Sequence, residues 1–258
     1  ASTEVVGELE FAWREADERA VWVAITGTNG KTTTTSLIEH LLKRTGRHAR
    51  AVGNIGEVAL ACVRDDPQDI YVAEISSFQL ASAPLMAPDV IVLLNITPDH
   101  ISWHGSMAAY IAAKAQVLAH ADAPGTTVIM DCTNGIVSDL CDEFSARSLS
   151  ARIIRLVDNQ EAGQLHEDDW AAAIDGHLRL VSDTCRDFGD VDRLQIKGEH
   201  NVLNALAAAS AASSLGLSDT EIAEGLAMFA PLEHRIEPCG VVDGVAYFND
   251  SKGTNVDA

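Results

Sequence analysis

The sequence has few cysteines and lacks any long, uninterrupted apolar run. Five cysteines are scattered among 258 residues, and none forms a C-x-x-C pair or a cysteine–histidine pair at the spacing of a zinc site. This pattern favours free thiols in a reducing compartment, so we expect a cytoplasmic protein. Because no apolar stretch reaches the length needed to cross a bilayer, we expect no membrane insertion.

Basic residues are also scarce, since Lys and Arg number 18 against 38 Asp and Glu, which gives a net charge of −20. This acidic balance disfavours non-specific binding to nucleic acid or to an anionic membrane. It does not exclude a phosphate ligand, because a loop, a lysine and Mg²⁺ set phosphate affinity locally. We therefore expect no nucleic-acid partner, and we expect the protein to be a monomer.

The segment 21–42 carries the strongest motif in the chain. An apolar run predicts a buried strand, a glycine-containing loop follows, and Lys31 and Thr32 then open a segment with apolar residues at helical spacing. The loop amides and the helix N-terminus attract an anion. Lys31 can reach terminal phosphates, and the Thr32 hydroxyl can bind Mg²⁺.

This loop departs from the general phosphate-loop pattern. G-x-x-x-x-G-K-[ST] requires glycine at position 25, where the chain has Ile25, and Gly27 comes two places later. The loop is therefore a shortened variant, G-x-x-G-K-T-T. The alternative interpretation is a plain glycine turn before a helix that begins with lysine.

Apolar strands alternate with helical segments over most of the chain, which predicts a P-loop-type α/β fold: a doubly wound, mostly parallel sheet with helices on both faces. The predicted strands cover residues 21–25, 47–52, 69–75, 90–95 and 126–130. The predicted helices cover residues 57–64, 107–120 and 202–215, and a helix also begins with a capping-box pattern at Ser218. Between residues 131 and 196 the pattern indicates only strands at 153–157 and 177–181, without a topology. A hairpin is expected at 240–248.

Polar side chains follow two further predicted strands. Glu74 and Ser76 end one strand, and Asp99 and His100 follow the next. Ligands bind at the carboxyl ends of strands in such sheets, and a carboxylate beside phosphates is a natural Mg²⁺ ligand. Taken alone, Glu74 could be a solvated loop residue and Asp99–His100 could be a turn. Three such strand ends in one sheet favour a shared site.

Two other groups of polar residues admit ordinary structural roles. Lys114 lies in a predicted helix and would normally be a surface residue. His200, Asn201 and Asn204 could cap the alanine-rich helix, and His200 and Asn204 could share one of its faces.

Three segments together resemble the Mur ligase family of ATP-dependent amide-forming enzymes. They are GTNGKTT at 27–33, NITPDH at 95–100 and HNVLNA at 200–205. The segments AEISSFQL at 73–80 and FNDSKGTN at 248–255 resemble the branch of that family that adds D-glutamate. The resemblance explains the shortened loop and extends from about Gly7 to the last residue.

The resemblance implies a three-domain enzyme of which this chain holds the middle. Residues 1–20 would lead in from an N-terminal UDP-substrate domain, residues 21–230 would form the central ATP-binding domain, and residues 231–258 would begin a second α/β domain that helps to bind the amino acid. The implied reaction joins D-glutamate to UDP-N-acetylmuramoyl-L-alanine through an acyl phosphate, in peptidoglycan precursor synthesis. We expect little ligase activity from this piece alone.

The resemblance also implies roles for individual residues. Those expected to bind ATP are Gly27, Thr28, Asn29, Gly30, Lys31, Thr32, Thr33, Asn204, Arg235 and Asp250. Two Mg²⁺ ions are expected, one held by Thr32 and Glu74, the other by His100 and Lys114, with Lys114 as a carbamate. Expected catalytic residues are Lys31, His100, Lys114 and Lys252. Expected substrate-binding residues are Asn54, Ser76, His100 and Thr254.

Two other functions remain open. One is a different ligase of the same superfamily, either another Mur ligase or an enzyme like folylpolyglutamate synthase. The other is a nucleotide-binding switch without ligase chemistry, for which Glu74, His100 and Lys114 would be dispensable.

Overall fold

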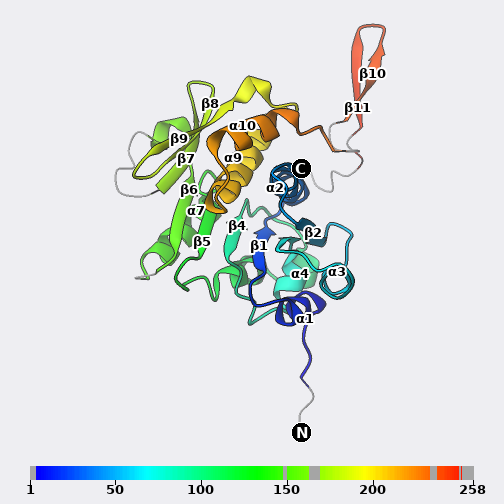
Figure 1. Ribbon diagram of the computed structural model, residues 1–258, viewed down its shortest axis with the longest axis vertical. Coiled ribbons are helices and arrows are strands. Elements are labelled where there is room, and N and C mark those ends of the chain that lie inside the picture. The colour runs from blue at the N-terminus through cyan, green and yellow to red at the C-terminus, as the bar shows by residue number, and fades with distance from the viewer. Residues whose placement is uncertain (1–3, 148–149, 163–168, 233–236, 250, 252–258) are drawn as a thin grey trace.

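In the part of the chain that the structure describes, a mixed β-sheet of nine strands forms the centre of the protein (Figure 1). The computed structural model describes residues 4–147, 150–162, 169–232, 237–249 and 251. In sheet order, the strands are β2 (Ala49–Gly53), β3 (Ile70–Glu74), β1 (Val21–Thr26), β4 (Val90–Leu93), β5 (Thr127–Asp131), β6 (Arg152–Leu156), β7 (Asp169–Ile174), β8 (His177–Val181) and β9 (Cys185–Asp190). Neighbours from β2 to β7 run parallel, and β8 and β9 are antiparallel. The predicted doubly wound, mostly parallel sheet is confirmed.

Helices cover both faces of this sheet. One face is packed by α2 (Lys31–Arg44), α9 (Glu199–Ser214) and α10 (Asp219–Met228). The other face is packed by α1 (Glu8–Glu15), α3 (Ala59–Asp65), α4 (Ser77–Leu80), α6 (Met107–Ala115), the 3-10 helix η1 (Gln116–Leu118), α7 (Gly135–Ser145) and α8 (Asn159–Ala162). The remaining short helices are α5 (Ile101–His104) and η2 (Val191–Arg193). None of the helices within the described residues is long and apolar enough to cross a membrane.

The alternation of side chains along β1 explains the two cores. Val23 and Ile25 point to the face covered by α2 and α9, whereas Trp22 and Ala24 point to the opposite face. Because both faces are covered, the strand is apolar throughout rather than alternating. Each large aliphatic side chain buried in this way contributes about 2 kcal/mol through removal of its surface from water.

The segment before β1 is an ordered helix that joins the second core. Leu9 and Ala12 of α1 are buried, and the Leu60 amide donates to the Glu8 carboxylate at 2.7 Å. Glu10 is fully buried, and its carboxylate accepts from the Leu85 amide at 2.9 Å and pairs with Arg14. The structure thus packs α1 onto the same layer as α3, which the prediction of a plain lead-in did not anticipate.

The region without a predicted topology contains α7 and the strands β6 to β9. Arg186 of β9 ties this part of the sheet to the connection between α9 and α10. Its guanidinium donates to the Asp219 carboxylate at 2.6 Å, to the Leu217 carbonyl at 2.7 Å and to the Ser213 hydroxyl. These bonds attach β9 to the end of the alanine-rich helix α9 and to the start of α10, a connection that the sequence pattern did not predict.

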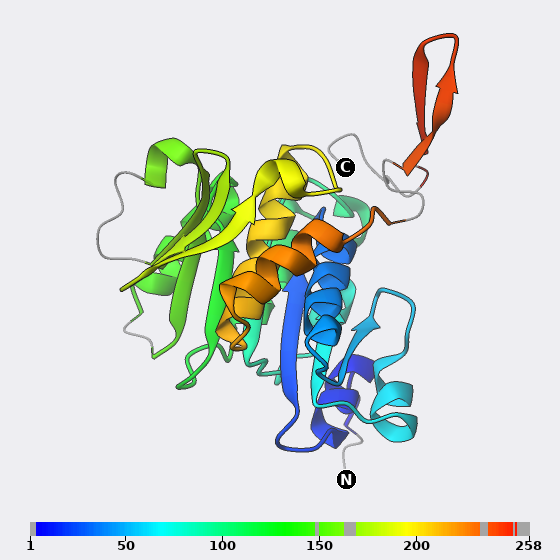
Figure 2. The ribbon, with the colours of Figure 1, turned by 45° about the horizontal axis from the view of Figure 1, so that its top comes forward.

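A separate two-stranded hairpin follows α10. Its strands are β10 (Glu237–Val242) and β11 (Val245–Asn249), which pair antiparallel. Figures 1 and 2 both show this hairpin projecting away from the sheet and its helices. The predicted hairpin is confirmed, and Val241 and Tyr247 are largely exposed on it.

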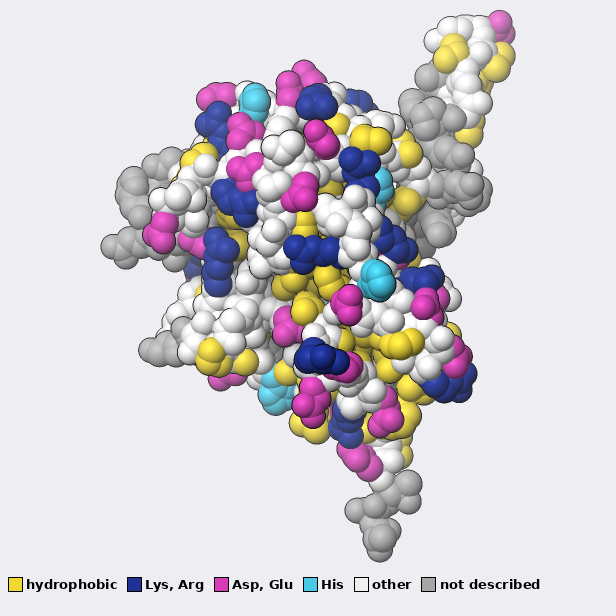
Figure 3. Space-filling view, viewed as in Figure 1, with side chains coloured by type: hydrophobic (Ala, Val, Ile, Leu, Met, Phe, Trp, Pro, Cys, Tyr) yellow, Lys and Arg dark blue, Asp and Glu magenta, His cyan; other side chains and the backbone are white. Residues whose placement is uncertain are grey.

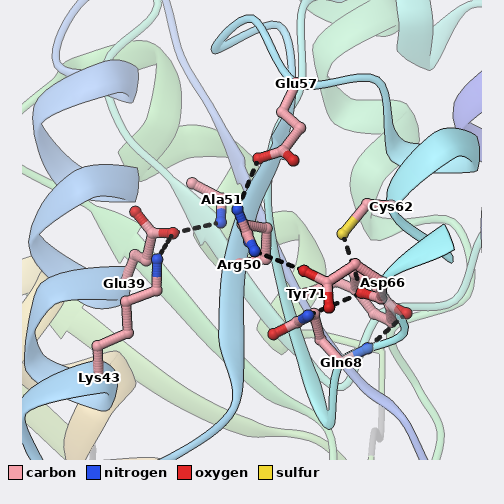
Figure 4. Close-up of polar contacts among 9 residues, drawn as sticks. All are labelled: Glu39, Lys43, Arg50, Ala51, Glu57, Cys62, Asp66, Gln68 and Tyr71. Carbon is pink, nitrogen blue, oxygen red and sulfur yellow. Dashed lines mark hydrogen bonds and ion pairs between the residues drawn. The ribbon is translucent and has the colours of Figure 1, made fainter.

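The outer strand β2 carries a polar cluster, shown in Figure 4. Arg50 pairs with Asp66 at 2.5 Å and with Glu57 at 3.5 Å. On the other side of the strand, the Ala51 amide donates to the Glu39 carboxylate of α2 at 3.0 Å. Elsewhere, acidic and basic side chains are interspersed over the face shown in Figure 3.

Candidate functional site

The phosphate loop, Glu74, Ser76 and His100 lie at or just beyond the carboxyl ends of three neighbouring strands. In the sheet register, Ile25 near the end of β1 lies beside Glu74 at the end of β3 and beside Val92 of β4. The phosphate loop follows β1, Ser76 follows β3, and His100 follows β4. The carboxyl ends of parallel strands are where α/β sheets bind ligands, so the topology brings these segments to one place.

The loop requires glycine at two positions. Gly30 has a φ of 84°, and a Cβ built there would lie 2.3 Å from the Asn204 amide oxygen. A Cβ on Gly27 would lie 2.8 Å from the Leu94 Cβ. The shortened spacing therefore fits a loop pressed between α9 and the end of β4, and only residues without a side chain fit at these two contacts.

Asn95 and Tyr110 hold the loop from the side of β4 and α6. The Asn29 amide donates to the Asn95 side-chain oxygen at 2.8 Å, and the Asn95 side chain donates back to the Asn29 carbonyl at 3.2 Å. The Thr28 hydroxyl lies 2.9 Å from the Tyr110 hydroxyl and donates to the Thr97 carbonyl at 3.2 Å. The Thr28 side chain is thus engaged within the protein.

Two lysines converge on one carbonyl of the loop. Lys31 donates to the Gly27 carbonyl at 2.9 Å and to the Thr28 carbonyl at 2.8 Å. Lys114 donates to the same Gly27 carbonyl at 2.6 Å. Lys31 and the loop were expected from the phosphate-loop motif and Lys114 from the family resemblance, and the structure joins them through direct contacts.

Lys114 is buried, so its interpretation as a surface residue is wrong. Only 2% of it is exposed, and its ammonium lies 4.9 Å from the centre of the Tyr110 ring. The pKa of Lys114 falls to about 7, because burial and, to a smaller extent, the charge of Lys31 lower it while Asp99 partly opposes both effects. A fraction of the amine is therefore neutral near pH 7, which makes its nitrogen nucleophilic.

Glu74 is also buried, with 2% of its surface exposed, so it is not a solvated loop residue. The Asn54 amide donates to Oε1 at 2.8 Å, while no donor among the described residues reaches the buried Oε2. A buried carboxylate oxygen without a donor fits the ligand that a divalent cation prefers. The residues present therefore fit a Mg²⁺ ion at this position.

Ser76 and His100 lie beyond the strand ends, each directly before a short helix. Ser76 caps α4: it accepts from the Gln79 amide at 3.3 Å, and its own amide donates to the Gln79 side chain at 2.9 Å. His100 precedes α5 in the left-handed region at φ 52°, with about half of its side chain exposed. A left-handed residue other than glycine costs about 1 kcal/mol or more, which surrounding structure must offset.

Asn204 lies under the loop rather than at the end of α9, so the capping interpretation is wrong for it. Its side chain is buried, accepts from the Thr34 hydroxyl at 3.3 Å and donates to Asn201 at 3.1 Å. Asn201 itself donates to the Lys197 carbonyl at 2.8 Å, and the cap position is Gly198.

Other predicted residues have less structural support. Thr32 lies half-buried in the first turn of α2. Within the described ranges, no group of three His, Cys, Asp or Glu side chains could by itself hold a metal ion. Four predicted residues lie outside the described residues: Arg235, Asp250, Lys252 and Thr254.

Comparison with known proteins shows the family to which the chain belongs. The family model described as "Mur ligase middle domain" matches residues 25–212. A UDP-N-acetylmuramoylalanine--D-glutamate ligase of Pelotomaculum thermopropionicum is 42% identical over 262 residues, covering 98% of this chain and 53% of that relative. The enzyme of the same name from Thermobifida fusca is 37% identical over 263 residues, which cover 100% of this chain and 55% of the Thermobifida enzyme. The chain thus spans about half the length of the curated relatives it matches.

Solved structures support the fold. MurF from Acinetobacter baumannii superposes with a TM-score of 0.69 at 20% identity, covering 94% of this chain and 53% of that one. A murein peptide ligase from Psychrobacter arcticus gives a TM-score of 0.63 at 20% identity, and the match covers 95% of this chain and 54% of that ligase. At this identity the likeness concerns the fold alone.

The doubly wound sheet, with a glycine loop between β1 and α2, defines a phosphate-loop α/β protein. Within that class, the chain belongs to the Mur ligase family, since the middle-domain model matches most of it. The resemblance drawn from the three sequence segments is confirmed.

Proposed function

We propose that this chain is the ATP-binding part of an enzyme that joins D-glutamate to UDP-N-acetylmuramoyl-L-alanine in peptidoglycan precursor synthesis. The observation that carries the proposal is the burial of Glu74 and Lys114 beside a phosphate loop, because buried charged groups are rare outside functional sites. The names of the two relatives at 42% and 37% identity support the choice of substrates.

ATP would bind with its phosphates against the loop amides and the N-terminus of α2. Lys31 is held at the loop by two carbonyls, and it would exchange them for phosphate oxygens. Mg²⁺, held by the Glu74 Oε2 atom and the Thr32 hydroxyl, would offset negative charge on the phosphates. Asn204, which adjoins Gly30, would lie on the nucleotide side of the loop.

The proposed reaction proceeds in two steps. A carboxylate oxygen of the UDP-linked substrate attacks the γ-phosphorus of ATP, and the bond to ADP breaks, which leaves an acyl phosphate. The D-glutamate nitrogen then attacks the acyl carbon, and phosphate leaves as the amide forms and the nitrogen loses its proton. Lys31 and the loop amides would stabilise charge on the transferring phosphoryl group.

Lys114 would act as a carbamate. Its neutral amine attacks the carbon of CO₂ and releases one proton, which converts the amine into an anionic carbamate with two oxygens. Together with His100, this group would hold a second Mg²⁺. The burial of Lys114 and the bond of its nitrogen to Gly27 support the proposal, because the amine is shielded from water and lies beside the loop that would bind the phosphates.

The substrate would approach from the side of α4. Asn54, which bonds to Glu74, together with Ser76 and His100, would bind the muramoyl substrate. Lys252 and Thr254 would serve the reacting end or the glutamate, and Arg235 and Asp250 the ribose and phosphates. In this proposal the central domain covers residues 21–230. Residues 1–20 lead into it, and residues 231–258 begin the amino-acid-binding domain. The enzyme would be a monomer in the cytoplasm.

Phosphate release by the full-length protein tests the proposal. Release should require ATP, Mg²⁺, UDP-N-acetylmuramoyl-L-alanine and D-glutamate together, and Glu74→Gln should abolish it. Turnover with L-lysine, diaminopimelate, or folate plus L-glutamate would instead identify another ligase of the superfamily. A nucleotide-binding switch would be identified if the wild-type protein showed no turnover with any of these substrates and ATP binding survived Glu74→Gln, His100→Ala and Lys114→Ala.

A further inference from the structure

We infer that His104 is a positioning residue: its hydrogen bond with Ser77 fixes α5 against α4 and thereby places His100 at the strand ends. The inference rests on the proposed function for its effect on turnover, while its structural part stands by itself. The His104–Ser77 bond joins the last residue of one short helix to the first residue of another.

The His104 ring is held on several sides. Its Nε2 atom lies 2.9 Å from the Ser77 hydroxyl oxygen, and Ser77 is only 2% exposed. The ring stacks on Phe78 with centroids 5.6 Å apart and planes at 14°, and its centroid lies 5.2 Å from that of Tyr110. This hydrogen bond is partly buried, and the rings packed against the imidazole restrict its orientation further.

His100 needs such support because it has little of its own. Its ring is half-exposed, lies 3.5 Å from the Asp99 carboxylate and packs at 5.0 Å against Phe78. The helix α5 that follows it has four residues, which is too short to be stable by itself. The far end of α5 must therefore be anchored, and His104 is that end.

The same histidine connects the substrate side of the site to the phosphate loop. His104 contacts Tyr110, and the Tyr110 hydroxyl lies 2.9 Å from the Thr28 hydroxyl of the loop. A continuous line of packed groups therefore runs from Ser77, beside the predicted substrate residue Ser76, to the loop. An error of about 1 Å in the placement of a reacting group can cost about 100-fold in rate, so a fixed α5 matters for turnover.

A spectroscopic experiment tests the structural part without any activity. In the 258-residue chain with ¹³C-labelled histidine, Ser77→Ala removes one hydroxyl and deletes no aromatic ring. We expect the His100 ring signal, assigned by its loss in His100→Ala, to shift or broaden. Ser182→Ala, which removes a hydroxyl from an exposed loop, should leave it in place. An unchanged His100 signal in Ser77→Ala overturns the inference.

Turnover by the full-length enzyme tests the functional part. We expect His104→Ala and Ser77→Ala each to lower kcat/KM for the UDP-linked substrate by about 10-fold or more, and the double variant to fall no further than about twofold below either. His104→Gln, which keeps a polar atom near Nε2, should recover part of the loss, and His120→Ala should match the wild type. Additive losses, or losses that only follow a lower melting temperature, overturn the inference. A wild-type enzyme without turnover would instead refute the proposed function, and the His100 signal would still decide whether His104 positions it.

Discussion

Replacing Lys114 with methionine should change how stability depends on pH. The pKa of Lys114 falls from an ordinary 10.5 to about 7 in the folded protein, mainly through burial. Between these values the unfolded chain holds a proton that the folded chain lacks, so wild-type stability rises with pH by about 1.36 kcal/mol per unit from this group. The methionine variant lacks this contribution.

The stability advantage of Lys114→Met over the wild type should therefore be largest near pH 7 and below, and should shrink as pH rises. From the two pKa values, the difference in unfolding free energy falls by about 2 kcal/mol between pH 7 and pH 9. Urea unfolding in CO₂-free buffer, which keeps the amine unmodified, measures this difference.

Lys197→Met provides the control, because it removes one positive charge from an exposed position. A difference between Lys114→Met and the wild type that stays constant from pH 7 to pH 9 would refute the reasoning. It would mean that the folded protein keeps an ordinary ammonium in spite of its burial, and the basis for a reactive amine at this position would be lost.

Three further substitutions test other parts of the structure. Gly30→Ala should lower the free energy of unfolding by about 1–3 kcal/mol and weaken ATP binding, because the added methyl group meets Asn204 and the residue has a φ of 84°. Thermal melts would measure the stability and calorimetric titration the ATP affinity; wild-type affinity would contradict the prediction. Glu74→Gln should keep the wild-type fold by circular dichroism but remove the Mg²⁺ dependence of ATP binding, and an unchanged Mg²⁺ titration would count against Oε2 as a ligand. Arg186→Lys should lose about 2 kcal/mol in urea unfolding, since a single ammonium cannot make the three contacts of the guanidinium; equal stability would show that these contacts contribute little.

The sequence predicted the parts of the fold whose signals are local. The strand β1, the glycine loop and α2 follow from an apolar run, two glycines and helical spacing. The hairpin β10–β11 and the capping box at Ser218 and Glu221 are equally local, and the structure confirms both. The strand β9 was missed because its sequence, CRDFGD, has little apolar character, and its place depends on the bonds that Arg186 makes to distant segments.

The site could be predicted only in part for a similar reason. Glu74 and His100 follow strands, so their approach to the loop could be deduced from the topology. Lys114 lies on a helix like any surface lysine, and only the fold brings it to the Gly27 carbonyl. Tyr110 and His104 belong to no motif that was singled out, and their contacts become visible only once α4, α5 and α6 are packed together.

The cluster on β2 has a consequence for how this protein behaves at high concentration. An outermost strand normally presents free amides that can recruit a strand from another molecule. Here the Ala51 amide is occupied by the Glu39 carboxylate, and the Gly53 amide donates to the Glu57 carbonyl at 2.8 Å. A second molecule would have to displace a carboxylate to pair along this strand, so this side of the sheet is protected against edge-to-edge aggregation by the chain's own side chains and loop.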